Sequence, residues 1–271
     1  MILENEKTSP VQHDWNHHWE VYTEATEHNP GQRYRRRIVR EFLERFGCSG
    51  SARILDIGSG QGDLALDLQH AFPQAEIAGL ELSDTGVRIS TVKAPTARFF
   101  QRDLLQNLGH PGPLSRWAQY AVCAEVLEHL DDPGRFLDNT AAYLAAGCTL
   151  VVTVPGGPQS EFDRYIGHRR HYAPRMLSDL LESRGYRVVF ATTAGFPFFN
   201  LYRLLVILRG RRLINDVSTA SPGGTSSLAR AAMAIFHRLF ALNVIGTRLG
   251  WQTIAVARWE ENAGGGGGGR E

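Results

Sequence analysis

The sequence predicts an α/β fold, with a mostly parallel sheet covered by helices on both faces. Three observations support this prediction. From about residue 53, short β-rich runs alternate with helical stretches; the first run ends directly in a glycine-rich turn; and the spacing between runs suits one crossover helix each. Strands joined by crossover helices run parallel and are buried between helical layers. The chain has 271 residues, 43% of them hydrophobic and 21% charged, which is ordinary globular composition with length enough for a full core.

About seven strands are expected. The first is the apolar run RILDIG at 53–58, which ends in glycine. The others are EIAGLELS (76–83), ARFFQRD (97–103), QYAVCAEV (119–126), TLVVTVP (149–155), YRVVFATTA (186–194) and WQTIAVARW (251–259). A helix ended by its glycine is expected for PRMLSDLLESRG, residues 174–185. These segments are expected to form one core domain at 49–195. The last strand of its sheet lies within 251–260.

An N-terminal helical cap or lid is expected over residues 1–48. Within it, QRYRRRIVREFLERF places five apolar residues on one helical face, namely Tyr34, Ile38, Phe42, Leu43 and Phe46. The arginines around the other faces indicate a solvated surface, with an anion or membrane contact as the alternative. Nearer the N-terminus lie four aromatic or imidazole side chains, which either close over a site or pack on the surface. They are Trp15, His17, His18 and Tyr22.

A helical insertion is expected at 196–250, between the last two strands. Residues 196–213 form an apolar run bracketed by arginines that is too short to span a bilayer. A helix buried on the domain, a substrate lid, an oligomer contact such as a homodimer, and a peripheral lipid contact are the alternatives for this region. The glycine-rich tail at 261–271 is expected to be flexible and without chemistry.

Charge and cysteine content indicate a cytoplasmic protein. The three cysteines (Cys48, Cys123 and Cys148) have no CxxC spacing and are expected to be reduced thiols. The first residues lack the pattern of a signal peptide, and no window reaches the roughly 18 apolar residues of a membrane span. A net charge of +1 argues against a polyanionic partner such as bulk nucleic acid.

The strongest motif is ILDIGSGQGDLALDL, at 54–68. A strand runs into Gly58, Gly60 and Gly62, and a helical pattern begins at once. Glycine permits sharp turns and close approach of a ligand, while a helix start offers unpaired N–H groups. The dinucleotide fingerprint is G-x-G-x-x-G, whereas this spacing is G-x-G-x-G with Asp56 two residues ahead. The loop therefore predicts a polar ligand, but the spacing disfavours an NAD-dependent oxidoreductase.

D-x-G-x-G-x-G resembles the signature of class I methyltransferases, whose Rossmann-like fold binds S-adenosylmethionine, and the likeness extends from about 50 to 190. It implies that Glu81 accepts hydrogen bonds from ribose hydroxyls, and that Asp103 and Leu104 meet the adenine. The full implied cofactor site is Asp56, Gly58, Gly60, Gly62, Glu81, Leu82, Asp103, Leu104, Ala124 and Glu125. A Rossmann-like fold without this cofactor is the alternative.

Residues 124–129, AEVLEH, resemble a stretch of the ubiquinone-pathway O-methyltransferases and small-RNA 2′-O-methyltransferases. In those relatives E-x-x-E-H can ligate a divalent ion. If this stretch is helical, Glu125, Glu128 and His129 share one face. We expect instead that these residues bind no metal and lie at the rim of the acceptor pocket, with the metal site as the alternative.

Two downstream histidines, His168 and His171, lie in FDRYIGHRRHY, which resembles a branch of generic small-molecule and glycan-modifying methyltransferases. The expected catalytic residues are His129 and His168, which position or deprotonate the acceptor. Arg169, Arg170 and His171 either bind an anionic group of the acceptor or pair with Glu161 and Asp163 to hold the loop.

The resemblance implies methyl transfer from S-adenosylmethionine to a small-molecule acceptor, more at oxygen than at nitrogen or carbon. No nucleic-acid partner is expected. The alternatives are an RNA acceptor, a lipid-linked or glycan-linked acceptor, and a cofactor-binding scaffold that has lost transfer activity.

Overall fold

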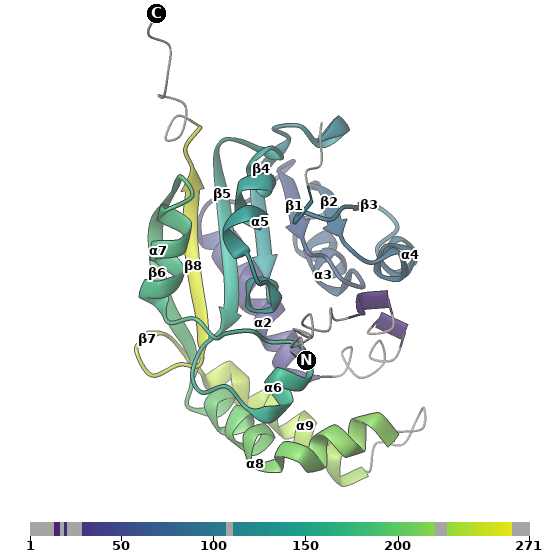
Figure 1. Ribbon diagram of the computed structural model, residues 1–271, viewed down its shortest axis with the longest axis vertical. Coiled ribbons are helices and arrows are strands. Elements are labelled where there is room, and N and C mark those ends of the chain that lie inside the picture. Colours follow the sequence, from purple (N-terminus) through teal and green to yellow (C-terminus); the bar gives the residue numbers. More distant parts are fainter. Residues whose placement is uncertain (1–13, 17–18, 21–28, 107–110, 220–226, 262–271) are drawn as a thin grey trace, which may run out of the picture.

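The computed structural model describes residues 14–16, 19–20, 29–106, 111–219 and 227–261. One eight-stranded sheet, in the order β3-β2-β1-β4-β5-β8-β6-β7, runs through the molecule (Figure 1). The strands are β1 (Arg53–Ile57), β2 (Glu76–Glu81), β3 (Arg98–Gln101), β4 (Ala118–Ala124), β5 (Leu144–Pro155), β6 (Tyr186–Phe196), β7 (Val244–Thr247) and β8 (Gln252–Trp259). The predicted α/β fold is confirmed, with β7 as one strand more than expected.

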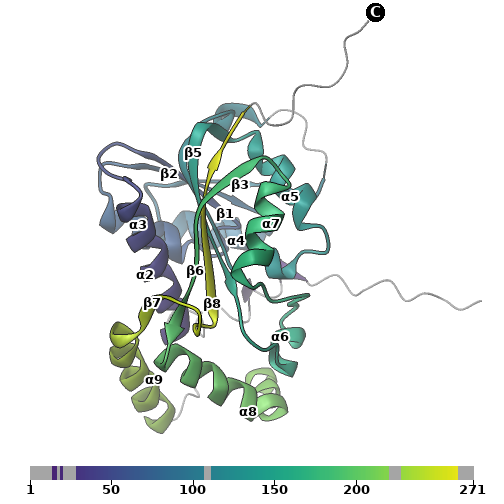
Figure 2. The ribbon, with the colours of Figure 1, turned by 90° about the vertical axis from the view of Figure 1, so that its left-hand side faces the viewer.

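Strands β1 to β5 pair in parallel, and β8 lies antiparallel between β5 and β6. Helices cover both faces of this sheet, as Figure 2 shows for α2 and α3 on one side and α5 and α7 on the other. The helices are α2 (Pro30–Arg45), α3 (Asp63–Ala71), α4 (Asp84–Lys93), α5 (Pro133–Ala141), α6 (Glu161–Tyr165), α7 (Pro174–Glu182), α8 (Phe198–Thr219) and α9 (Ser227–Leu239). Between β3 and β4, where a crossover helix was expected, the described residues hold only the 3-10 turn η1 (Gly112–Leu114).

Two apolar clusters, one on each face, hold the sheet between its helices. Neighbouring residues of a strand point to opposite faces, so Leu55 joins one cluster and Ile54 the other. Helix α2 buries Tyr34, Ile38, Phe42 and Leu43, as the helical periodicity predicts. The three cysteines are free and buried.

The parallel register brings the carboxyl ends of three strands to one edge of the sheet. Ile57 of β1 lies opposite Leu80 of β2 and Cys123 of β4. The residues that follow these strands are therefore neighbours, although they lie far apart in the sequence. This edge is where ligands bind in open α/β sheets.

The described residues between β6 and β8 are largely helical, as expected. They include α8, α9, the 3-10 turn η3 (Phe240–Leu242) and β7, and they form one end of the molecule below the sheet in Figure 1. Rings of Phe199 and Phe240 lie 5.2 and 5.3 Å from the ring of Tyr34, so the insertion packs on α2. Among the described residues, no helix is long and apolar enough to cross a membrane.

Candidate active site

The glycine-rich turn after β1 adopts the conformation that its sequence predicts. Gly58, Gly60 and Gly62 have φ angles of 75°, 54° and 83°, which L side chains rarely adopt. The amides of Gly58 and Ser59 both donate to the carbonyl of Leu80. Gly62 is the N-cap of α3, so the turn ends at a helix start, whose first N–H groups have no partner within the helix.

Replacing Gly62 by alanine is expected to destabilise the fold by about 2 to 4 kcal/mol. An added Cβ would lie 2.7 Å from Cβ and 2.9 Å from Cα of Ser90, in addition to the left-handed strain. Gly50→Ala is the matched control, since Gly50 has φ +57 and open space around it. Urea unfolding of both variants should give a clearly larger loss for Gly62→Ala, and equal losses would contradict the packing role of Gly62.

The carboxylate of Glu81 lies directly below this turn. Its Oε2 accepts from the amide of Gly60 at 2.8 Å, and its Oε1 accepts from the amide of Ser83 at 2.9 Å. Burial raises the pKa of Glu81, while these hydrogen bonds act in the opposite direction. Each carboxylate oxygen can accept a further hydrogen bond, so Glu81 can hold the turn and a ligand together.

Asp56, on β1, carries a buried acceptor for which the described part of the chain offers no hydrogen-bond donor at Oδ2. The residue is 2% exposed, and burial, followed by the charge of Glu81, raises the pKa of its carboxyl to about 7. A buried polar atom without a partner is costly, and a bound polar ligand would satisfy it. Asp56, Glu81 and the glycine turn therefore fit a ligand rich in hydrogen-bond donors.

Asp103, the third acidic residue expected to bind the cofactor after Asp56 and Glu81, lies slightly outside its expected place. Asp103 was expected to end a strand, but β3 ends at Gln101 and Asp103 lies in the following turn, where its Oδ1 accepts from the amide of Leu105. Leu104 is buried in the core, whereas Leu82, directly after β2, is 38% exposed.

Residues of the N-terminal segment lie over this edge of the sheet. Asn16 Oδ1 accepts from the Ser83 hydroxyl at 2.7 Å. The ring of Trp19 lies so close to Gly60 that a Cβ there would come within 2.8 Å of it. Trp15 meets the ring of His129 edge-on at 4.9 Å. His17, His18 and Tyr22 lie outside the described residues.

Glu125 follows β4 in the left-handed conformation, with φ 58°, which is uncommon for a residue with a side chain. Its Oε2 lies 2.9 Å from Nε of Arg35, and its Oε1 accepts from Gln252 Nε2 at 2.7 Å and from the Thr153 hydroxyl at 3.1 Å. The expectation that the arginine-rich face of α2 is solvated is thus wrong for Arg35, which reaches into the site. Neither Arg35 nor Gln252 was singled out by any sequence motif.

Glu128 and His129 belong to a 3-10 turn, η2 (Leu127–His129), which does not include Glu125. A common helical face of Glu125, Glu128 and His129 required a helix through all three residues, and this condition is not met. Glu128 is fully buried, and within the described ranges neither of its carboxyl oxygens has a hydrogen-bond partner. Burial, and then the charge of Glu125, raises the pKa of Glu128 well above its ordinary value, which favours the protonated carboxyl.

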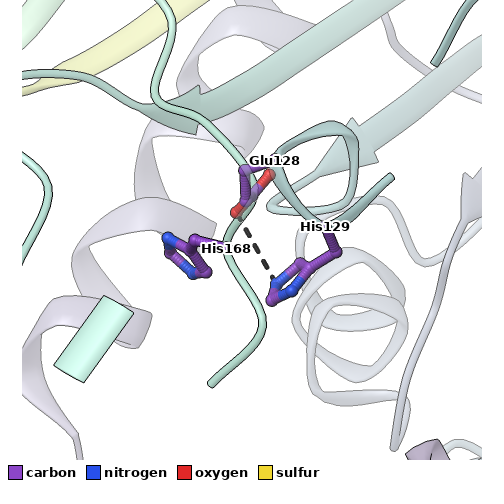
Figure 3. Close-up of side chains that lie close together, drawn as sticks. All are labelled: Glu128, His129 and His168. Atoms are coloured by element: carbon purple, nitrogen blue, oxygen red, sulfur yellow. Dashed lines mark ion pairs between the residues drawn. The ribbon is translucent and has the colours of Figure 1, made fainter. Parts of the chain in front are cut away.

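His129, His168 and Glu128 converge at this point (Figure 3). Nε2 of His129 lies 4.0 Å from Oε1 of Glu128, and the rings of His129 and His168 meet edge-to-face at 4.7 Å. Burial first, and then His129, lowers the pKa of His168 to about 2, so this imidazole is neutral at neutral pH. The three side chains offer ligand atoms within 4.8 Å of one another, and a metal ion could therefore bind here.

The loop that carries His168 is held by contacts that the sequence left open. Arg169 Nε lies 3.3 Å from Oδ1 of Asp131, and Arg170 donates to the Asp131 carbonyl at 3.2 Å. Asp163, which was considered as a partner of Arg169, Arg170 and His171, lies 3.8 Å from His171 and pairs with Arg203 of α8. The two arginines thus join the loop to the segment that follows η2.

Comparison with known proteins identifies the family of this chain. The model of a family described as a methyltransferase domain matches residues 32–190. The chain belongs to this methyltransferase family. It is accordingly a class I enzyme dependent on S-adenosylmethionine, as the glycine-rich turn and its acidic partners predicted, and Asp56 and Glu81 fit this donor-rich cofactor.

Similar curated methyltransferases act on different molecules. The chain is 28% identical to the ubiquinone/menaquinone biosynthesis C-methyltransferase of Syntrophotalea carbinolica, over 61% of this chain and 69% of that one. It is 24% identical to the ubiquinone biosynthesis O-methyltransferase of Nitrosomonas europaea, over 65% and 71%. It is 27% identical to the trans-aconitate 2-methyltransferase of Mycobacterium sp. (strain KMS), over 54% of this chain but only 56% of the relative.

Solved structures share the fold. The [4+2]-cyclase SpnF superposes with a TM-score of 0.57 at 20% identity, over 83% of this chain and 80% of the cyclase. The geranyl diphosphate C-methyltransferase of Streptomyces coelicolor A3(2) gives a TM-score of 0.50 at 12% identity, over 82% and 77%. Because one of these proteins is named a cyclase, the fold alone does not fix the reaction.

Proposed function

We propose that this methyltransferase transfers the methyl group of S-adenosylmethionine to a hydroxyl oxygen of a small molecule, with His168 as the base. The observation that supports this proposal is the neutral, buried imidazole of His168 beside His129, at the sheet edge that carries the glycine-rich turn. A protonated oxygen nucleophile needs a base, whereas an already ionised acceptor does not. A neutral imidazole carries a lone pair that can accept this proton. Its lowered pKa makes it a weak base, so the proton transfer must accompany formation of the new bond to the methyl carbon.

The residues proposed to hold the cofactor are those expected from the sequence. Glu81 would accept from the ribose hydroxyls, and Asp56 would gain a donor for its Oδ2, while the turn from Gly58 to Gly62 allows close approach. When bound, the cofactor supplies a methyl group already activated on a sulfonium. We further propose that Trp15 and Trp19, within the expected 1–48 cap, close over the site and exclude water.

The chain's own contribution to the reaction is orientation and a proton transfer. His168 takes the hydroxyl proton of the acceptor as the oxygen lone pair forms the new bond to the methyl carbon. The bound cofactor would supply the methyl group and keep the electron pair of the carbon–sulfur bond, so it would leave as a neutral thioether. His129, 4.7 Å from His168 between ring centroids, would position the acceptor. Holding the reacting atoms in line is the main source of rate in such a displacement.

One feature favours a second acceptor class, a lipid-linked hydroxyl. Leu201, Leu204, Leu205 and Leu208 recur at i, i+3, i+4 and i+7 of α8, yet all four are at least 40% exposed. Such a stripe would be expected to face the core or a lipid surface. Flotation of the protein with phosphatidylglycerol vesicles would support a lipid-linked acceptor, and protein that stays at the bottom would argue against it.

Incubation of cell extract with the enzyme and trideuteromethyl S-adenosylmethionine tests the proposal. Mass spectrometry should reveal a small molecule that carries the label on oxygen, absent when the enzyme is omitted. Label found only on nitrogen, carbon or RNA would overturn the proposed acceptor. If no label is transferred while calorimetry still detects cofactor binding, the chain is a binding scaffold instead.

Strong chelation is expected to leave the transfer rate unchanged within about twofold. Burial, and then the charge of Glu125, raises the pKa of Glu128, which disfavours the ionised carboxylate that a divalent ion needs as a ligand. Labelled product formed after dialysis against a strong chelator provides the measurement. The alternative, a functional metal site at Glu128, His129 and His168, would be established by three results together. Chelation would abolish activity, a divalent metal would restore it, and Glu128→Ala would show the same loss.

A further inference from the structure

A buried ion pair links the helical insertion to the histidines of the site. Nη2 of Arg203, on α8, lies 2.9 and 2.8 Å from the two carboxylate oxygens of Asp163, on α6. Arg203 is 7% exposed and Asp163 is fully buried. Burying two charges costs desolvation that their attraction only partly offsets, so such a pair is weak support for stability and raises the question of another role.

Asp163 is held in one orientation by further hydrogen bonds. Its Oδ2 accepts from both the amide and the hydroxyl of Ser160, each at 2.7 Å, and these contacts cap α6. The charge of Arg203 and these bonds lower the pKa of Asp163 despite its burial, so it stays ionised. Both oxygens of Asp163 are bonded to Arg203 or Ser160, so Asp163 is fixed in place. For the same reason it is a poor candidate for a metal ligand.

Asp163 contacts both downstream histidines. Its Oδ1 lies 3.9 Å from Nδ1 of His168, and its Oδ2 lies 3.8 Å from Nε2 of His171. The backbone amide of His168 also donates to the Asp163 carbonyl at 2.9 Å. The position of the His168 loop therefore depends on where Asp163 is held.

The hydrogen bonds of the two rings fix their tautomers. Nδ1 of His171 lies 3.1 Å from the carbonyl of Gly157, which can only accept, so this nitrogen carries the proton. Nε2 of His171 then has a free lone pair and accepts from Nδ1 of His168 at 3.2 Å. The remaining nitrogen of His168, Nε2, is left without a proton, which is the form that a base requires.

We propose that Arg203 is a positioning residue that, through Asp163 and His171, holds His168 in the tautomer whose Nε2 accepts the proton of the acceptor. This role rests on the proposed function of His168. The insertion thus supplies a part of the acceptor side that the core alone lacks. Other charged or titratable groups lie near these rings and also set their protonation: Arg35 of α2, Glu125 after β4, and Glu128 and His129 of η2.

Nitrogen NMR of the full chain labelled with ¹⁵N-histidine tests the proposal without cofactor or acceptor. Long-range nitrogen–proton spectra distinguish the two neutral tautomers and the imidazolium. His168→Asn and His171→Asn assign the signals. In the wild type, both rings should be neutral and protonated at Nδ1 at pH 7.

Arg203→Met should remove this pattern. Without its cation, Asp163 either draws a proton onto a ring, with a titration midpoint at least about one pH unit higher, or becomes protonated and donates to His171. Arg203→Lys should restore the wild-type spectrum in large part, because it keeps the charge. Arg238→Met, which changes an exposed arginine of α9, should leave the spectrum unchanged.

Unchanged tautomers and midpoints in a folded Arg203→Met protein would overturn the proposal. If that variant does not fold, Asp163→Asn gives the same test, and a wild type that lacks the Nδ1–H form of either ring overturns the proposal by itself. The wild type can show the expected tautomers yet transfer no label, while Arg203→Met loses the tautomer pattern. The absent label transfer would then refute the proposed function, and the lost pattern would still support this role of Arg203.

Discussion

Replacing Glu81 by alanine is expected to weaken S-adenosylmethionine binding by about 100-fold or more. Hydrogen bonds to a charged group contribute roughly 1.5 to 3 kcal/mol each, and a ribose diol would donate two of them to this carboxylate. The substitution also removes the acceptor of the Gly60 and Ser83 amides, so the glycine-rich turn loses its anchor. Isothermal titration calorimetry of the folded variant measures the change.

A glutamate at the other end of the same strand provides the matched control. Glu76 begins β2, its side chain is 64% exposed, and its contact with Arg98 at 3.5 Å is a surface ion pair. Glu76→Ala should therefore bind the cofactor as the wild type does. Glu81→Gln keeps the shape but turns an N–H₂ group toward the Gly60 or Ser83 amide, so it should also bind weakly. Wild-type affinity in Glu81→Ala would refute the assignment of Glu81 to the cofactor.

Local patterns were enough to predict the sheet and its glycine-rich turn. A strand such as β1 is a short apolar run that ends in Gly58, and each feature of that signal depends only on neighbouring residues. β7 was missed because its four residues, Val244–Thr247, show little of the alternation that marks a strand; they pair only with β6 at the sheet edge. β5 begins earlier than expected because Leu144 pairs with Ala118.

The acceptor side of the site could be predicted only in part. His129 and His168 were proposed from motifs, but the ion pairs around them join distant segments: Arg35 precedes Glu125 by 90 positions, and Arg203 follows Asp163 by 40. Such pairings depend on how α2 and α8 pack against the sheet, which no local pattern encodes. The left-handed backbone of Glu125 likewise requires knowledge of the fold.

His168→Asn is expected to lower kcat by about 100-fold, the lower end of the usual contribution of a positioned base because its lowered pKa weakens it, and to leave cofactor affinity unchanged. Asparagine keeps a polar side chain but cannot take up a proton. Once labelled extract has identified the acceptor, initial rates at saturating cofactor measure kcat. His70→Asn, at the exposed end of α3, is the matched control and should be fully active.

The pH dependence of kcat separates a base in this environment from an ordinary histidine. A base whose pKa is lowered keeps its lone pair as the pH falls, and it is protonated only below that lowered value. Because the pKa of His168 lies far below its ordinary value of 6.5, wild-type kcat should stay level between about pH 7.5 and 5. Asp56, with a pKa of about 7, titrates within this range, but its effect falls on cofactor affinity and is removed at saturation. A fall in kcat with a midpoint near 6.5, or near wild-type kcat in His168→Asn, would show that His168 is not the base.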